Sequence, residues 1–200
     1  MSLQNRVTPE GEIVATPERG LLMGNRGGQM HDGERRLTGR RWVSRAWITC
    51  LLDYKGWREQ IMKPGRYTQL FFLDEATALA AGHRPCGLCR RTDFGRFLAL
   101  WPHRAASDGQ PKVAAIDLVL HAERLLPGRG KRDHEEAIAE IPAGCFLRLG
   151  DDSHLVTADG LLPWSPFGYG RPIEKPARGQ FAVLTPRSSS RAIRLGATRK

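Results

Sequence analysis

Two cysteines three positions apart, Cys86 and Cys89, constrain this chain more than any other feature of its sequence. A Cys-x-x-Cys turn places two thiolates about as far apart as one tetrahedral metal ion requires. Gly87 lies inside the turn and gives the backbone the freedom that such a tight loop needs. Thiolate ligands favour zinc or an iron–sulfur cluster among the soft-ligand metals. The sequence therefore predicts half of a structural zinc site at this turn.

A redox-active cysteine pair of the thioredoxin type is the main alternative for this motif. Such a pair is expected at the start of a helix that follows directly on a strand. Here Asp74 is a good N-cap for a helix through DEATALAA, and Gly82 ends that helix immediately before the motif. Because a helix and its glycine stop precede the cysteines, a metal site is favoured over a redox pair.

The run LFFLDEATALAAGHRPCGLCRR, about residues 70–91, resembles the second half of the Ada-type metal-binding domain, the zinc-bearing module of a bacterial DNA alkylation-repair protein. The resemblance is densest at Arg84-Pro85-Cys86 with Cys89, although a histidine stands at position 83 where the family usually has Phe or Tyr. The family supplies two more cysteines upstream, spaced Cys-x-x-x-Cys, whereas this chain has only Cys50 there. The resemblance implies a zinc fold. The family's methyl-transfer chemistry is not carried over, because one upstream cysteine is missing.

Cys50, Cys86 and Cys89 supply three ligands, and a closed structural zinc site needs four. The candidates for the fourth are His31, His83, His103 and Cys145. We choose His31, because it lies upstream of Cys50 as the family's first ligand does. The alternative for His31 is a surface histidine in a Gly/Arg-rich loop. His83 is expected to pack in place of the family's aromatic residue, and Cys145 to be a small buried apolar residue.

The balance of charge points to polyanionic partners. The chain has 200 residues and a net charge of +10, with arginine dominating the basic set. Basic proteins attract polyanions, and the planar guanidinium group suits phosphate, so nucleic acid is the first partner to consider. No apolar run is long enough for a membrane helix, and the N-terminus lacks the apolar core of a secretory signal. We therefore expect a cytoplasmic protein with no membrane partner.

Arginines cluster just before Cys50 and around Cys86, and Trp42 and Trp47 interleave with the first group. Arginine on phosphate combined with aromatic stacking on bases is typical of nucleic-acid grooves. The predicted nucleic-acid contacts are Arg35, Arg36, Arg40, Arg41, Arg45, Arg84, Arg90 and Arg91. The alternative is that the tryptophans are core residues and the arginines form a solvated face.

Along the chain we expect an α+β protein with a zinc-centred N-terminal module of short strands and helices and a small β-rich C-terminal half. The expected divisions are a flexible arm over residues 1–20, the zinc module over 21–103, a linker near 104–112, and a helical and then β-rich region over 113–200. The alternative is that this last region packs with the module as one unit. Helices are predicted near residues 74–81, 92–101, 113–126 and 134–140. Strands are predicted within residues 42–52 and 66–73 and in the runs CFLRL, HLVTA and FAVL.

The leading functional hypothesis is a nucleic-acid-binding protein, with DNA as the first candidate, stabilised by one structural zinc ion. A hydrolase or nuclease acting on nucleic acid is the alternative, with Asp117, His121 and His134 as candidate catalytic residues. Asp117 and His121 are spaced i,i+4, so they share one face of the predicted helix. A third hypothesis is a structural or protein-interaction zinc module. The enzyme hypothesis requires these three side chains to meet in an open cleft.

Overall fold

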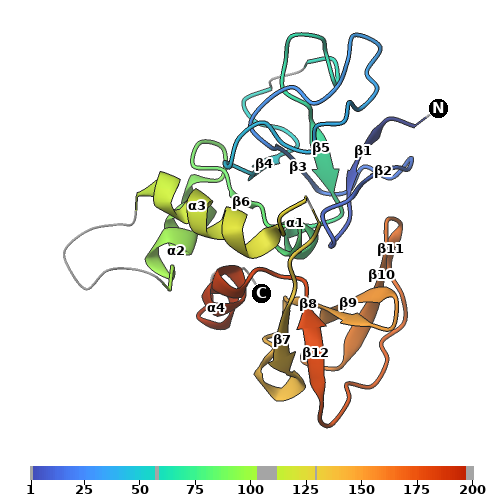
Figure 1. Ribbon diagram of the computed structural model, residues 1–200, viewed down its shortest axis with the longest axis vertical. Coiled ribbons are helices and arrows are strands. Elements are labelled where there is room, and N and C mark those ends of the chain that lie inside the picture. The colour runs from blue at the N-terminus through green and yellow to red at the C-terminus, as the bar shows by residue number, and fades with distance from the viewer. Residues whose placement is uncertain (1, 57–58, 103–111, 129, 197–200) are drawn as a thin grey trace.

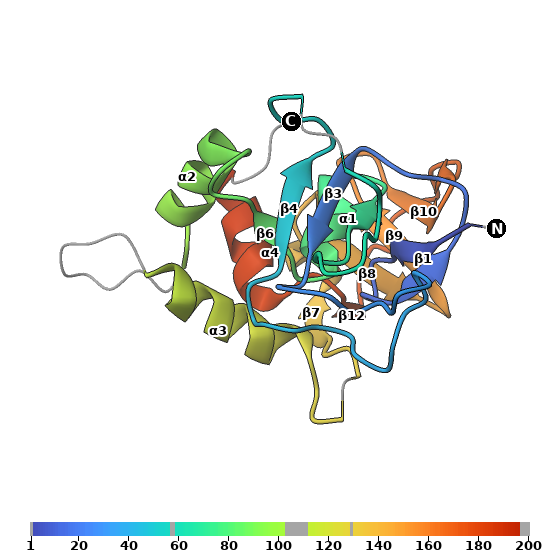
Figure 2. The same cartoon turned by 90° about the horizontal axis from the view of Figure 1, so that it is seen from above.

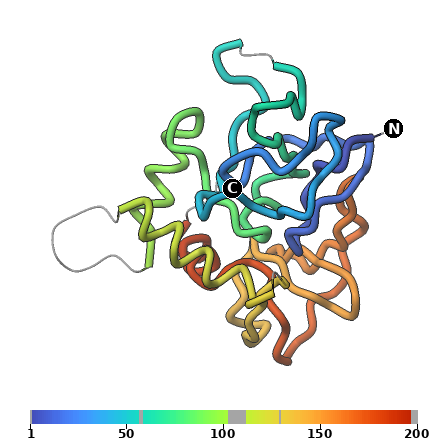
Figure 3. Tube along the Cα trace, turned by 45° about the horizontal axis from the view of Figure 1, so that its top comes forward, coloured from blue at the N-terminus to red at the C-terminus, as the bar shows by residue number. Residues whose placement is uncertain are grey.

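The computed structural model describes residues 2–56, 59–102, 112–128 and 130–196. Two six-stranded sheets and four α-helices make up the fold, which confirms the predicted α+β class. Figure 1 shows the first sheet above the second, with helix α1 between them. Figure 3 shows the same division from a tilted view, with the blue and green N-terminal segments on one side and the orange and red C-terminal segments on the other.

The first sheet is built from the N-terminal half of the chain, in the order β2-β1-β5-β3-β4-β6. Its strands are β1 (Gln4–Val7), β2 (Ile13–Ala15), β3 (Leu22–Asn25), β4 (Ile48–Leu51), β5 (Leu70–Phe72) and β6 (Arg84–Pro85). Strands β4 and β6 pair in parallel at one edge, with Thr49 opposite Pro85. This pairing brings the strand that carries Cys50 beside the turn that carries Cys86.

The predicted flexible arm over residues 1–20 is wrong for most of its length. Strands β1 and β2 form an antiparallel hairpin, and β1 also pairs with β5. Pro9 and Gly11, which indicated disorder, instead form the hairpin turn. Gly11 has a φ of +84° and donates from its N–H to the Thr8 carbonyl over 2.8 Å. The hairpin is held because Val7 and Ile13 are buried in the core beneath the sheet.

Helix α1 (Glu75–Ala80) begins and ends as the sequence predicts. The Asp74 carboxylate accepts hydrogen bonds from the backbone N–H and the hydroxyl of Thr77, both over 2.8 Å. Gly82 follows the helix with a φ of +84°, a conformation that costs glycine little. The residues of α1 from Thr77 onward are buried. Because the alanines are small, neighbouring elements can pack closely against every face of this part of the helix.

Two further helices, α2 (Arg91–Ala99) and α3 (Val113–Arg124), lie close to their predicted positions. Ile116 and Leu120 are buried on α3 as expected, whereas Val113 is exposed. Helix α3 packs on α4 (Arg187–Arg194), and the Glu123 carboxylate accepts from the backbone N–H and the hydroxyl of Ser188 over 2.9 and 2.7 Å. The predicted linker at residues 104–112 lies, except for its last residue, outside the described residues.

The second sheet is entirely antiparallel and has the order β11-β10-β9-β8-β12-β7. Its strands are β7 (His134–Ala137), β8 (Phe146–Leu149), β9 (Asp152–Val156), β10 (Leu161–Ser165), β11 (Gly168–Tyr169) and β12 (Gln180–Val183). The predicted helix over residues 134–140 is wrong, since this segment forms β7 and then the short 3-10 helix η1 (Ile138–Glu140). Pairing of β7 along all of β12 overrides the helical tendency of HEEA.

One hydrophobic cluster extends across both halves of the chain. It joins Leu79 of α1 and Phe97 of α2 to Leu120 of α3 and to core residues of the second sheet and α4. Helix α1 also contributes Ala80 to a separate cluster with Phe146. The N-terminal region that carries Cys50, Cys86 and Cys89 therefore shares a core with the C-terminal half, with α1 as the common element.

Asp74 links the two halves as well as capping α1, so its removal should be costly. Its second carboxylate oxygen accepts from the Tyr169 hydroxyl over 2.6 Å. Burial raises the pKa of Tyr169 above its usual range, and the Asp74 carboxylate raises it further, so the hydroxyl stays protonated and donates. We expect Asp74→Ala to lower the free energy of unfolding by about 2 kcal/mol, through loss of a helix cap and a charged hydrogen bond. Urea denaturation measures this change, and the exposed turn residue Asp151 provides the control variant Asp151→Ala, expected to change stability by less than about 0.5 kcal/mol.

Candidate metal centre

Three cysteines from two segments meet at the β4–β6 edge of the first sheet. Cys50 lies within β4, and Cys86 and Cys89 lie in the turn between β6 and α2. The Cys86 N–H donates to the Thr49 carbonyl over 2.8 Å, which fixes the turn against β4. The three sulfur atoms lie within 4.8 Å of one another. Metal–sulfur bonds of about 2.3 Å in tetrahedral geometry separate sulfurs by about 3.8 Å, so this group could hold a metal ion.

Hydrogen bonds within the group favour a thiolate at Cys86. The Cys50 thiol donates to Cys86, which lowers the pKa of Cys86 to about 5, and the backbone N–H of Leu88 supports the same sulfur over 3.4 Å. The same hydrogen bond and burial raise the pKa of Cys50, and burial raises that of Cys89. Metal binding must therefore displace protons from Cys50 and Cys89, which makes the affinity dependent on pH.

His31 is not the fourth ligand, so this prediction is wrong. Its Nδ1 lies 2.7 Å from the Thr68 hydroxyl and its Nε2 lies 3.3 Å from the Lys63 carbonyl. These hydrogen bonds hold the buried ring in the loop before β4, and His31 is not part of the metal-ligand group found among the described residues. His31 precedes Cys50 in the sequence, but the loop that carries it places its ring beside Thr68 and not beside the three cysteines.

The other candidates for a fourth ligand are also placed elsewhere. His83 is fully buried, with its ring centroid 4.7 Å from that of Phe72 and 5.0 Å from that of Trp47, so it packs as the family's aromatic residue would. Cys145 lies in the second half of the chain, where its thiol contacts the Ser190 hydroxyl over 3.4 Å. His103 lies outside the described residues.

A cavity of about 500 Å³ adjoins the three cysteines. It is lined by apolar side chains such as Met23 and Phe71 and by the polar groups of Glu59 and Tyr67. Burial raises the pKa of Tyr67, and the cysteines and Glu59 raise it further. Sequence reasoning missed Glu59 and Tyr67, because nothing in their spacing relates them to the cysteine turn.

Two of the predicted nucleic-acid contacts are instead structural ion pairs beside the cysteines. Arg84 is buried and donates to both Asp117 carboxylate oxygens over 2.7 and 2.8 Å. Arg90 is buried too, and it pairs with Glu75 and Asp93. These partners and the lack of exposure leave neither guanidinium group available to a phosphate.

The remaining predicted contacts are on the surface or half-buried. Arg36 is exposed but pairs with the neighbouring Asp32 and Glu34. Of the predicted contacts, Arg35, Arg40, Arg45 and Arg91 are exposed and form no ion pair with the described residues. Arg41 is half-buried. The alternative prediction, that the tryptophans are core residues, holds for Trp47. This residue is buried and cannot stack on a base without rearrangement.

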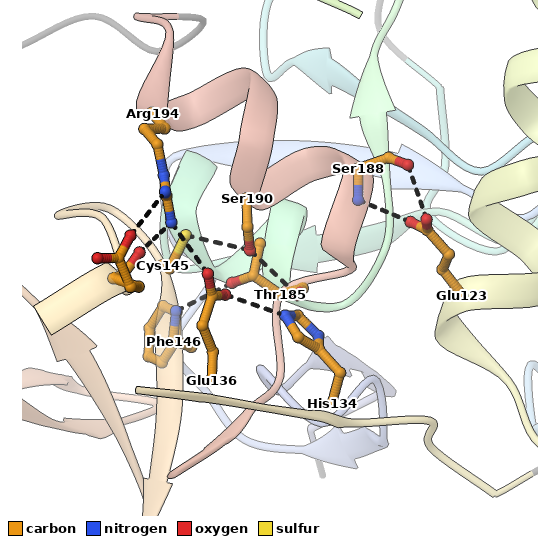
Figure 4. Close-up of polar contacts among 10 residues, drawn as sticks. Glu123, His134, Glu136, Cys145, Phe146, Thr185, Ser188, Ser190 and Arg194 are labelled. Carbon is orange, nitrogen blue, oxygen red and sulfur yellow. Dashed lines mark hydrogen bonds and ion pairs between the residues drawn. The ribbon is translucent and has the colours of Figure 1, made fainter. Parts of the chain in front are cut away.

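The three candidate catalytic residues do not converge, so the enzyme hypothesis loses its proposed site. Asp117 is engaged by Arg84. The ring of His121 packs edge-on against Trp42, with centroids 5.6 Å apart. His134 lies on the second sheet, where its Nε2 is 3.4 Å from a carboxylate oxygen of Glu136, as Figure 4 shows. The i,i+4 spacing of Asp117 and His121 thus positions a salt bridge and an aromatic contact.

Comparisons with known proteins add no family assignment. No family of known proteins matches the chain, and no curated protein or solved structure is significantly similar to it. Within the described residues, every helix is too short or too polar to cross a membrane.

Proposed function

We propose that this protein binds nucleic acid through an arginine-rich loop that a zinc ion anchors to the sheet. The three thiolates of Cys50, Cys86 and Cys89 match the preference of zinc for sulfur ligands. The resemblance of the cysteine turn to the Ada-type module supports zinc over other soft-ligand metals. The described residues supply three of the four ligands that such a zinc ion needs.

The observation that carries the nucleic-acid proposal is the position of the unpaired arginines. Arg35, Arg40 and Arg45 are exposed on the loop between β3 and β4, the strand that carries Cys50. Figure 2 shows the end of this loop running into β4 beside α3. A loop fixed at both ends loses less entropy when it binds a phosphate backbone, and arginines without carboxylate partners lose no ion pair.

Neutralising two of these arginines should weaken binding to DNA in a salt-dependent manner. For Arg40→Gln with Arg45→Gln we expect about 10-fold weaker binding near 100 mM salt, and a slope of log affinity against log salt that is shallower by about 2. Fluorescence anisotropy with a labelled duplex and a labelled single strand measures both quantities.

The matched control carries Arg171→Gln and Arg178→Gln, which remove the same charge from exposed positions in the C-terminal half. This control should bind within about two-fold of the natural protein if the loop makes the contacts. Equal weakening by both double variants would show that only net charge matters. Absence of binding to any DNA or RNA at low salt would overturn the proposal.

A further inference from the structure

A second pocket, separate from the three cysteines, gathers cationic side chains that the proposed zinc site does not use. Its volume is about 220 Å³, and it lies between the β1–β2 turn, the loop before β4 and the segment after α3. The charged groups that line it are Arg26, Arg41, Arg124, Lys131, Glu10 and Glu12. The lining thus holds four cationic and two acidic side chains.

Two of these cations are buried and form no ion pair with the described residues. Arg26 is 2% exposed and Arg124 is 1% exposed. The ion pairs found among the described residues involve neither of them, nor Lys131. A buried charge is costly unless a counter-charge compensates it. The fold therefore retains an excess of buried positive charge next to a cavity.

Backbone carbonyl groups hold both guanidinium groups in place but do not neutralise them. Arg26 donates to the carbonyls of Gly11 and Arg41 over 2.8 and 3.3 Å. Arg124 donates to the carbonyls of Gly82 and Arg45, both over 2.7 Å. The Nε of Arg124 is buried and has no hydrogen-bond partner among the described residues.

Packing fixes these cations further. The guanidinium carbons of Arg26 and Arg124 lie 3.9 and 3.8 Å from the ring centroid of Trp47. Burial and the neighbouring arginines hold the pKa of His83 well below its usual range, so the neutral ring accepts from Arg26 Nε over 3.3 Å. Gly82 leaves room for Arg124, because a Cβ there would lie 2.5 Å from Arg124 Cδ. The charges are thus preorganised.

Repulsion between the cations of the pocket adds to the cost of burying them. Burial lowers the pKa of Arg26 to about 9 and that of Lys131 to about 7. Lys131 is held by a hydrogen bond of 2.5 Å to the Ala80 carbonyl, so its ammonium group stays at the pocket. An anion would relieve the mutual repulsion of these groups.

We propose that this pocket binds a phosphate monoester group. With Lys131 protonated, the lining has two more cationic than acidic side chains, which matches the two negative charges that a phosphate monoester carries above its second pKa of about 6. A bound anion favours that protonation. At about 30 Å³ for each water, the cavity has the volume of about seven waters, enough for a phosphate group and the first atoms attached to it. Glu10 and Glu12 can accept hydrogen bonds from hydroxyl groups next to the phosphate.

The phosphate group could belong to a small molecule or to the end of a nucleic-acid strand. The second source rests on the proposed nucleic-acid function, since the same loop that exposes Arg40 also places Arg41 in the pocket. Both sources present the same chemistry to the cations, and the experiment below separates them.

The test uses the full chain and compares an arginine of the pocket with an exposed arginine outside it. We expect about 10 mM inorganic phosphate or ribose 5-phosphate to raise the melting temperature by about 5 °C, because the ligand binds the folded state alone. Arg41→Gln should weaken binding at least about 10-fold in calorimetry, since Arg41 lines the pocket. Arg171→Gln removes the same charge from an exposed position in the C-terminal half and should bind as the natural protein does. If Arg41→Gln fails to fold, Lys131→Gln replaces it.

Two outcomes would overturn the pocket proposal. One is no rise in melting temperature with either phosphate compound. The other is equal weakening by Arg171→Gln and Arg41→Gln. A 5′-phosphorylated oligonucleotide that binds at least about 10-fold tighter than its 5′-hydroxyl form, with the preference lost in Arg41→Gln, would identify a strand end as the source. If both oligonucleotides fail to bind while ribose 5-phosphate binds, the pocket proposal stands with a small-molecule ligand and the nucleic-acid proposal fails.

Discussion

Cys86→Ser is expected to remove one zinc ion per chain and to lower the free energy of unfolding by about 4 kcal/mol or more. Cys86 is the sulfur on which the hydrogen bonds of Cys50 and Leu88 converge, and its turn joins β6 to α2. Without the metal, two cysteine segments far apart in the sequence lose the bond that ties them. Metal analysis gives the stoichiometry, and thermal unfolding should show a fall of about 10 °C in the melting temperature.

Cys145→Ala is the control for this variant. Cys145 is also buried, but it lies in the second half of the chain and contacts Ser190. The control should keep one zinc ion per chain and lose no more than about 1.5 kcal/mol. His31→Asn should keep the zinc as well, because the ring of His31 is held by Thr68 and Lys63. Metal-free natural protein as stable as the metal-loaded form would contradict the zinc proposal.

Asp117→Ala is expected to lower the free energy of unfolding by about 3–5 kcal/mol, because it leaves the guanidinium group of Arg84 buried without a counter-charge. Arg84 donates two hydrogen bonds to Asp117, and both side chains are less than 10% exposed. The pair ties α3 to β6, two residues before Cys86. We therefore also expect weaker zinc binding in this variant, measured by competition with a chelator.

A double variant and a surface pair test this explanation. Arg84→Met combined with Asp117→Leu removes both charges and should recover most of the lost stability. Glu34→Ala breaks the exposed pair with Arg36 and should cost less than about 1 kcal/mol, since both partners are solvated. If Asp117→Ala and Glu34→Ala cost the same in urea denaturation, burial of the Arg84 charge is not the cause.

Features with local causes could be predicted from the sequence. Helix α1 has its cap, its apolar residues and its glycine stop within nine consecutive positions, so no distant contact was needed to place it. The grouping of Cys86 with Cys89 follows from a four-residue turn. Cys50 was assigned to the same group through the resemblance to the Ada-type module, and the pairing of β4 with β6 brings it there.

Features that depend on pairing between distant segments could not be predicted. From the sequence, Pro9 and Gly11 indicated a disordered arm. In the structure the arm is ordered, because β1 pairs with β5. The segment His134–Ala137 has a helical composition but pairs with β12. Strands as short as these carry too little alternation of apolar and polar residues to be recognised, and tertiary pairing decides their conformation.

The sequence by itself determined the cysteine turn, the helix before it and the excess of arginine. The tertiary structure alone decided what each arginine does. Arg84 and Arg90 are neutralised by carboxylates, Arg26 and Arg124 are buried around Trp47, and Arg40 remains exposed. The physical reason is that the role of a charged side chain depends on the groups that folding places around it. Asp117 lies 33 positions from Arg84 in the sequence, and only packing of α3 against β6 brings the two together.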